Sequence, residues 1–319
     1  MEERPLGRRI DVHFHIIPDF YKEAAHEAGA APAIGRYPAW SPELALKLMD
    51  ANEIDVALTS VSQPGVHFGE PEKAWRLARK CNDYAADVAF AHSGRFGSFA
   101  LVPMQNADHA IAELDHCFDQ LNFAGACLFA SYGDKFLGDP AFDPVMESLN
   151  QRGAAVFVHP NYHPSSKALE LPWPGFMMEF VFDTTRAAAN MLWNGTLDRY
   201  PRIRFILSHA GGVLPYLAWR LSVASMIDQR LPRLSQEDVY RQLARYWYDT
   251  AIAAGDQTLG ALTKVAREDR IVFGSDWPYC SAEVVEAEVR DLARAQALSA
   301  VARAAIDRFN ALQLFPHLA

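Results

Sequence analysis

The chain has 319 residues, of which 50% are hydrophobic and 22% are charged, a composition typical of a folded globular protein with a substantial core. Its formal net charge of −9 argues against binding to a nucleic acid backbone, which requires clustered lysine and arginine. The charged start MEERPLGRR does not resemble a signal peptide, and no run of eighteen uncharged apolar residues follows, so we expect neither secretion nor a membrane span.

The cysteines indicate the compartment. Four are present, at positions 81, 117, 127 and 280, and none of them has CxxC spacing. This pattern predicts neither a disulfide framework nor a structural zinc knuckle. We therefore expect a reducing, cytoplasmic environment.

Short apolar or β-branched segments recur along the chain at intervals of about 30 to 45 residues, with Ala- and Leu-rich helical stretches between them. They predict strands at residues 9–15, 55–61, 96–102, 124–130, 154–160, 203–210, 246–251 and 270–277. Among the helices, residues 41–52 have Ser41 as a cap, and residues 143–153 begin at an Asp cap and end at Gly153. Residues 161–180, rich in proline and aromatic residues, predict a long loop after the fifth strand.

Eight strand–helix units in a chain of this length predict a closed parallel (β/α)8 TIM barrel, whose strands are buried on both faces and therefore look continuously apolar. No internal repeat or polar linker interrupts the pattern, so we expect a single domain over residues 1–319. A doubly wound open sheet is the alternative fold. It is disfavoured because no GxGxxG motif follows the first strand.

The first predicted strand ends in a His-x-His pair within the segment IDVHFHIIP, residues 10–18. Alternate side chains of a strand point the same way, so His13 and His15 should face the barrel axis and Phe14 should point outward. Two inward imidazoles about 6 to 7 Å apart can chelate one cation. Taken alone, such a pair is as often structural as functional.

Other polar residues end their strands at the same mouth of the predicted barrel. His159 follows the apolar run in VFVHP, His209 follows FILS in FILSHAGG, and Asp276 ends IVFGSDWP. Buried imidazoles and carboxylates are costly without partners, so packing does not explain this convergence. The sequence therefore predicts a metal site built from ligands and acid–base groups. Asp249, at the end of the seventh strand, either orients a ligand histidine or caps a helix.

In this order, His-x-His, VFVHP, SHAGG and FGSDWP resemble the amidohydrolase superfamily, specifically its branch of metal-dependent decarboxylases related to aminocarboxymuconate-semialdehyde decarboxylase. Longer segments resemble 6-methylsalicylate decarboxylase-like members of that branch. These are residues 60–70, 94–103, 137–153 and 182–212. The similarity extends from about residue 10 to residue 312.

The resemblance implies one divalent metal ion and no organic cofactor. Its ligands would be His13, His15, His159 and Asp276, with zinc as the expected ion and manganese as the alternative. His209 would be the acid–base residue, and Asp276 would be both a ligand and a second candidate proton donor. A binuclear site bridged by a carboxylated lysine is not expected, because the fourth strand offers no lysine before Lys135.

Four further residues are candidate substrate contacts. The resemblance implies that Arg220, on the helix after the sixth strand, reaches a substrate carboxylate in a neighbouring subunit, so we expect a homodimer or a higher homo-oligomer. The alternative is an arginine on an ordinary amphipathic helix. Trp40 and Phe182 could form apolar walls for an aromatic ring or belong to the core. His67 could contact substrate or be solvated.

These features predict a metal-dependent, non-oxidative decarboxylase, a carboxy-lyase acting on a hydroxybenzoate-type (salicylate-like) aromatic acid or a related unsaturated carboxylic acid. The alternative is a metal-dependent hydrolase of a lactone or amide that uses metal-activated water. A non-catalytic metal-binding barrel would require a missing ligand, and none is missing. The sequence leaves open the ring substituents, the choice between zinc and manganese, and whether His209 or Asp276 delivers the proton.

Overall fold

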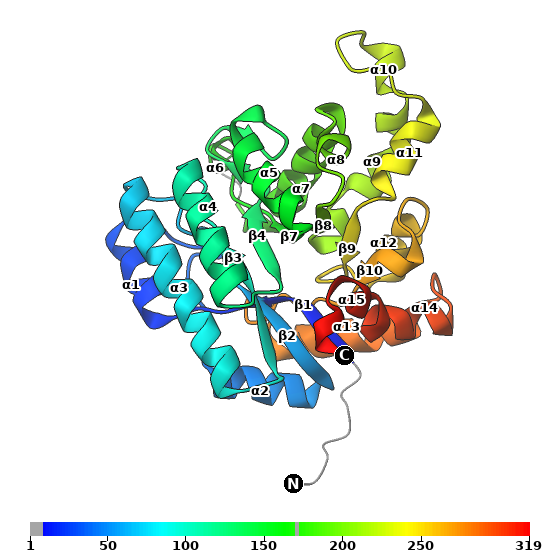
Figure 1. Cartoon of the computed structure of the whole chain (residues 1–319). Helices are drawn as coiled ribbons and strands as arrows, with labels where there is room; N and C mark the ends of the chain where they lie inside the picture. Colours follow the sequence, from blue (N-terminus) through cyan, green and yellow to red (C-terminus); the bar gives the residue numbers. More distant parts are fainter. Residues whose placement is uncertain (1–8, 170–171) are drawn as a thin grey trace.

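The computed structural model describes residues 9–169 and 172–319, and within these ranges eight parallel strands form one sheet surrounded by helices (Figure 1). The described residues do not include residues 1–8 of the charged start or residues 170–171 of the predicted long loop. The strands follow the order β1 (Arg9–His15), β2 (Ile54–Ser60), β3 (Phe96–Leu101), β4 (Gly125–Phe129), β7 (Ala155–His159), β8 (Arg204–Leu207), β9 (Trp247–Asp249) and β10 (Ile271–Val272). All eight predicted strands are confirmed.

The first and last strands meet and close the barrel. The Val12 N–H donates to the Phe273 carbonyl at 3.0 Å, the His15 N–H donates to the Trp277 carbonyl at 2.7 Å, and a parallel bridge joins Phe14 to Trp277. Each strand therefore has neighbours on both sides, which confirms the predicted (β/α)8 TIM barrel.

Helices connect the strands and cover the outside of the barrel (Figure 1). Their bounds are α1 Asp19–Glu27, α2 Pro42–Ala51, α3 Pro71–Ala91, α4 Ala107–Asp115, α5 Asp143–Arg152, α6 Pro164–Lys167, α7 Phe176–Trp193, α8 Thr196–Arg199, α9 Leu214–Ser222, α10 Ala224–Ile227, α11 Gln236–Leu243, α12 Asp256–Leu262, α13 Ala282–Arg294, α14 Ala300–Ala304 and α15 Asn310–Leu314. None of these helices is long and apolar enough to cross a membrane.

The barrel interior is packed with apolar side chains from every strand of the sheet. The members of this cluster are Ile10, Val12, Val56, Leu58, Phe99, Cys127, Ala155, Phe157, Ile206, Trp247 and Val272, which pack with Ala311, Leu314 and Phe315. The last three lie on or directly after α15, so the C-terminal helix closes the end where the strands begin. The opposite end, where the strands stop, holds the polar side chains.

A bulge in β1 changes which side chains face inward. Between the pairs Asp11–Ala57 and Phe14–Thr59, three steps along β1 oppose two along β2. The extra residue shifts the alternation by one position, so Val12 faces the interior and His13 does too. Phe14 points outward and packs on Trp277 with the ring centroids 4.9 Å apart, as the alternation predicts.

Two local expectations from the sequence need correction, and one small element was not expected. The predicted long loop 161–180 contains α6, and its last five residues already belong to α7, whose aromatic residues at 176 and 180 lie one helical turn apart. Asp143 does not cap α5, because its carboxylate accepts from Arg199; Asp139 instead caps a short 3-10 turn that leads into α5. A small antiparallel hairpin, β5 (Ser131–Tyr132) with β6 (Lys135–Phe136), was not predicted.

Gly274 lies where the chain passes β1 near the barrel mouth, and it has no room for a side chain. A Cβ there would lie 2.7 Å from the Cβ of His13 and 3.3 Å from the Cβ of Asp249. We therefore expect Gly274→Ala to lower the free energy of unfolding by about 1–3 kcal/mol, measured by chemical denaturation.

Gly260→Ala is the matched control, because Gly260 lies within α12 and the nearest atom to an added Cβ is 4.0 Å away. This change should be neutral or stabilise by up to about 1 kcal/mol through helix propensity. Equal effects of the two substitutions would contradict the close approach at the barrel mouth.

Candidate metal centre and substrate cavity

Four buried side chains converge at the mouth of the barrel. They are His13, His15, His159 and Asp276, and one ligand atom from each lies within 4.8 Å of the others. The Nε2 atoms of His13 and His15 are 3.1 Å apart, and Asp276 Oδ1 lies 3.2 Å and 2.9 Å from them. Ligands bound to one ion at about 2.0–2.2 Å have neighbours about 3 Å away, so these three atoms have the spacing of a coordination shell. The Nε2 atoms of His13 and His15 are therefore much closer together than the spacing of about 6 to 7 Å expected from the strand repeat.

The remaining nitrogen of each histidine is engaged on the outer side of the cluster. His13 Nδ1 lies 2.7 Å from Asp249 Oδ2, which is the contact that an orienting role for Asp249 requires. His15 Nδ1 lies 3.1 Å from the Ser60 carbonyl, and His159 Nδ1 lies 2.8 Å from the Pro160 carbonyl. Each acceptor favours a proton on Nδ1, which leaves the Nε2 lone pair for a metal ion. Three imidazole nitrogens and a carboxylate oxygen therefore fit a divalent ion such as zinc.

The electrostatics of the cluster also favour a cation. Burial opposes protonation of His13, but the carboxylates of Asp249 and Asp276 outweigh it and raise the pKa of His13 to about 10. Burial lowers the pKa of His15 and, more strongly, that of His159. Burial would raise the pKa of Asp276, yet His13 and the hydrogen bonds around it hold that pKa well below the ordinary value. The Asp276 carboxylate therefore stays charged beside the neutral imidazoles of His15 and His159, and the raised pKa of His13 shows that this carboxylate and that of Asp249 favour positive charge at the cluster.

Two of the predicted site residues have unusual backbone conformations. His209 has φ +54° and Asp276 has φ +56°, a left-handed region that residues other than glycine rarely adopt. The His209 N–H donates to Asp249 Oδ1 at 2.7 Å, and the Asp276 N–H donates to the His13 carbonyl at 2.8 Å. These bonds hold both residues beyond the ends of their strands, where such local strain often accompanies function.

Close packing explains why the SHAGG motif ends in glycine. Gly212 has φ +67°, and a Cβ there would lie 2.1 Å from the Val181 carbonyl oxygen on α7. Helix α7 can therefore approach the loop that carries His209, which brings its first two turns to the cavity.

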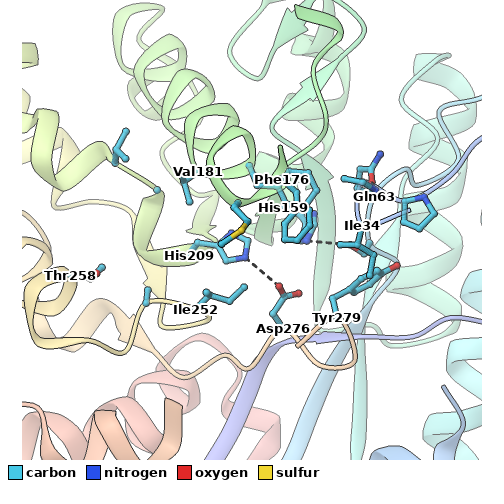
Figure 2. A pocket seen from close by; sticks show the side chains of 18 residues that line it. Ile34, Gln63, His159, Phe176, Val181, His209, Ile252, Thr258, Asp276 and Tyr279 are labelled. Atoms are coloured by element: carbon cyan, nitrogen blue, oxygen red, sulfur yellow. Dashed lines mark hydrogen bonds and ion pairs between the residues drawn. The ribbon is translucent and has the colours of Figure 1, made fainter. Parts of the chain in front are cut away.

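His209 lies next to the cluster and faces the cavity (Figure 2). Its Nε2 is 3.5 Å from Asp276 Oδ2, while its Nδ1 is buried and finds no hydrogen-bond partner among the described residues. His209 can therefore exchange a proton with a bound molecule or with Asp276 from the Nε2 side.

A cavity of about 290 Å³ opens onto this polar end. Its walls are mostly apolar. In Figure 2, Val181, His209 and Ile252 lie on one side of the cavity, and Ile34, Gln63 and Tyr279 lie on the other. The described lining residues are Pro32, Ala33, Ile34, Ser62, Gln63, His159, Phe176, Met177, Phe180, Val181, His209, Gly212, Val213, Ile252, Ala253, Thr258, Asp276 and Tyr279. Neither lysine nor arginine occurs among them. The cavity suits a small molecule with an apolar body and a polar end.

The four predicted substrate contacts do not appear among the described residues that line this cavity. Trp40 is buried and packs on Tyr84, with the ring centroids 6.0 Å apart. His67 lines a different cavity and contacts the ring of Tyr132. Phe182 lies on α7, and Arg220 is exposed on α9.

The sequence interpretation missed the cavity walls. Phe176 and Phe180 are four residues apart on α7, so they share one face, whereas Phe182 lies on another. The four-residue spacing of the two phenylalanines in FMMEF, residues 176–180, indicates a helix face, but these residues were assigned to the loop. Asp11 was also missed: its Oδ1 accepts from the N–H groups of His13 and Ser275, and burial raises its pKa to about 7. It ties β1 to the segment that carries Asp276.

Comparisons with known proteins agree with this geometry. A family model described as Amidohydrolase matches residues 10–317. The 6-methylsalicylic acid decarboxylase of Penicillium expansum is 34% identical over 97% of each chain, and 6-methylsalicylic acid decarboxylase acuB of Aspergillus aculeatus is 36% identical over 97% of this chain and 96% of its own. The crystal structure of a 2,6-dihydroxybenzoate decarboxylase complexed with 2,6-dihydroxybenzoate matches with a TM-score of 0.79 and 25% identity, covering 97% of this chain and 99% of that one.

These named relatives are decarboxylases, and therefore carboxy-lyases. The resemblance inferred from the histidine and glycine motifs is confirmed. Because the family model spans nearly the whole chain and the two 6-methylsalicylic acid decarboxylases exceed 30% identity over almost their full lengths, this protein belongs to the amidohydrolase family.

Proposed function

We propose that this protein is a metal-dependent, non-oxidative decarboxylase of a salicylate-like hydroxybenzoate. The observation that carries the proposal is one cavity with apolar walls and a polar end. His159 and Asp276 line that end and belong to the same cluster as His13 and His15. The names of the relatives, which act on aromatic acids, support the same reaction class.

The four clustered residues His13, His15, His159 and Asp276 would hold the ion. A divalent ion at this position would neutralise negative charge on the substrate and polarise its oxygen atoms. We propose zinc, with manganese as the alternative, because histidine-rich ligand sets suit both. No organic cofactor is needed for this chemistry.

The cavity walls would orient the aromatic ring. Phe176 and Phe180 present aromatic surface from α7, and Val181 and Ile252 complete an apolar side. An aromatic acid can bury its ring there only with its carboxylate toward the histidine cluster, because the opposite orientation would place a charge against apolar walls. Binding would therefore select one orientation of the substrate.

His209 is the proposed proton donor. Its Nε2 would deliver a proton to the ring carbon that bears the carboxylate, and the carbon–carbon bond electrons would return to the ring as CO2 leaves. Asp276 Oδ2, 3.5 Å from that nitrogen, would stabilise the protonated imidazole before the transfer. The product would be the corresponding phenol, and His209 would regain its proton from solvent.

The first test is CO2 release, with product identification by mass, from Zn- or Mn-loaded protein given salicylate, 6-methylsalicylate and dihydroxybenzoates. We expect His209→Asn to lower kcat by about 10²–10⁴-fold while metal binding persists, because the proton donor is lost. Asparagine tolerates the left-handed backbone at this position better than most residues.

His116→Asn is the control, since that imidazole pairs with Asp83 outside the cavity lining and should leave kcat unchanged. If the His209→Asn protein turned over every acid at the wild-type rate, this would contradict the role of His209 as the proton donor. If the metal-loaded protein were inert to all the acids but hydrolysed lactones, the hydrolase function would be supported instead of the decarboxylase function.

A second prediction concerns Asp249, which holds the outer nitrogen of His13. Asp249→Asn should weaken metal binding by about 10–100-fold, because the ring of His13 loses its negative partner and its fixed tautomer. Competition with a chelator for Zn²⁺ and Mn²⁺ measures the change. Asp139→Asn, which alters only the cap of a 3-10 turn, should leave the affinity unchanged. Equal affinities for all three proteins would show that Asp249 does not support a metal ligand.

We also propose a homodimer or higher homo-oligomer in which Arg220 completes the site of a neighbouring copy. The side chains next to Arg220 on α9 are unusually exposed for apolar residues, with Tyr216 at 85% and Trp219 at 66%, and Met226 and Ile227 extend this face onto α10. A second copy on this face would cover them and would bring a cation to a cavity whose described lining has none.

Mixing two inactive variants tests this arrangement. A dimer of Arg220→Ala with Asp276→Ala contains one site with both residues intact if Arg220 acts across the interface. Random mixing should then recover about a quarter of the wild-type rate, because half of the dimers are mixed and each has one complete site. Light scattering gives the mass in solution. A monomer, or a dimer with no recovery, would contradict the proposal.

A further inference from the structure

Ile252 occupies an unexpected conformation at the wall of the substrate cavity. It lies in the loop between β9 and α12 and has φ +51°, which is strongly disfavoured for a β-branched residue. Its side chain lines the cavity on the same side as His209 (Figure 2) and is 58% exposed. A conformation of this kind persists only where neighbouring groups hold it.

The group that holds it is a buried carboxyl on a different element. Glu288 lies on α13, is only 6% exposed, and its Oε1 accepts the backbone N–H of Ile252. The preceding N–H, of Ala251, donates to Asp249 Oδ1 at 3.1 Å. Two successive amides are therefore held by two buried acids, which sets the path of the loop from behind the cavity wall.

This hydrogen bond is costly to build, which argues that it has a use. Burial raises the pKa of Glu288 to about 9, so the group is an uncharged acid at neutral pH. Its second oxygen, Oε2, is buried and has no hydrogen-bond partner among the described residues. A leucine or methionine would fill the same space without this penalty, but it could not accept the N–H of Ile252.

We propose that Glu288 is a positioning residue that holds Ile252 in its left-handed conformation, so that the isoleucine side chain forms a substrate-contacting wall of the cavity. The substrate part of this inference rests on the proposed decarboxylase function. Without the carboxyl, Ile252 relaxes to an ordinary negative φ, and its side chain leaves the wall beside His209 and Asp276. The ring of the substrate then loses an apolar contact, while the metal ligands and the proton donor stay in place.

The decisive variants are Glu288→Met and Glu288→Gln, which have similar size but differ in their hydrogen-bond acceptor. We expect Glu288→Met to raise KM for the aromatic acid about tenfold, equivalent to one lost contact, with kcat within about twofold. Glu288→Gln keeps an acceptor and should retain the wild-type KM. Glu286→Ala, on the exposed side of the same helix, is the control for a change in α13 itself.

A double-mutant cycle separates positioning from a general loss of structure. Ile252→Ala should raise KM to the same extent as Glu288→Met, and the two changes together should do no more, because both act through one side chain. Additive effects, or an equal loss of kcat in Glu288→Met, would overturn the inference.

A structural readout keeps the test independent of the reaction. In a crystal structure of Glu288→Met, φ of Ile252 should be negative, whereas Glu288→Gln should keep it positive. In the wild-type protein the Ile252 amide should be protected from hydrogen exchange despite its exposed side chain. An unprotected amide, or a positive φ in Glu288→Met, would overturn the inference even if no aromatic acid is turned over, in which case the proposed function fails separately.

Discussion

The carboxylate of Asp249 is the contact on which the rest of the site depends. One oxygen lies 2.7 Å from Nδ1 of His13, and the other accepts the N–H groups of His209 and Ala251. A single buried acid at the end of β9 therefore orients a predicted metal ligand, holds the backbone of the proposed proton donor, and starts the loop that leads to Ile252. Because all three contacts share one side chain, the cluster and the cavity wall have a fixed relation to each other.

The cavity separates charge from apolar surface. Its polar end is a set of buried groups that compensate one another, with the Asp276 carboxylate against the imidazoles and the outer nitrogens satisfied by carbonyls and Asp249. Its remaining walls come from the start of α7 and from the loop after β9. A flat, apolar ring with one charged edge matches this division, because each part of such a molecule meets a surface of its own kind. Helix α7 and Ile252 therefore contribute to substrate binding in the proposed activity, beside the clustered residues.

Most of the barrel could be predicted from the sequence, because buried parallel strands appear as continuous apolar runs at regular intervals. The four clustered residues could also be predicted, since each lies in the last three residues of a strand or just beyond its end, and all strand ends of a parallel barrel meet at one mouth. The cavity walls could not. The predicted loop covers the start of α7 and so hides the helical spacing of Phe176 and Phe180. Trp40, a predicted wall, packs instead on Tyr84 of α3.

The eight strands, the family and the polar residues at the barrel mouth can be deduced from the chain alone, because each follows from local periodicity or from motifs that span a few residues. The arrangement of the site follows only from the folded structure: the bulge in β1, the left-handed backbones of His209 and Asp276, and the hydrogen bond that the Ile252 N–H donates to Glu288. These features come from contacts between segments far apart in the chain. Their energies depend on distances of a few tenths of an ångström, which no local pattern of residues specifies.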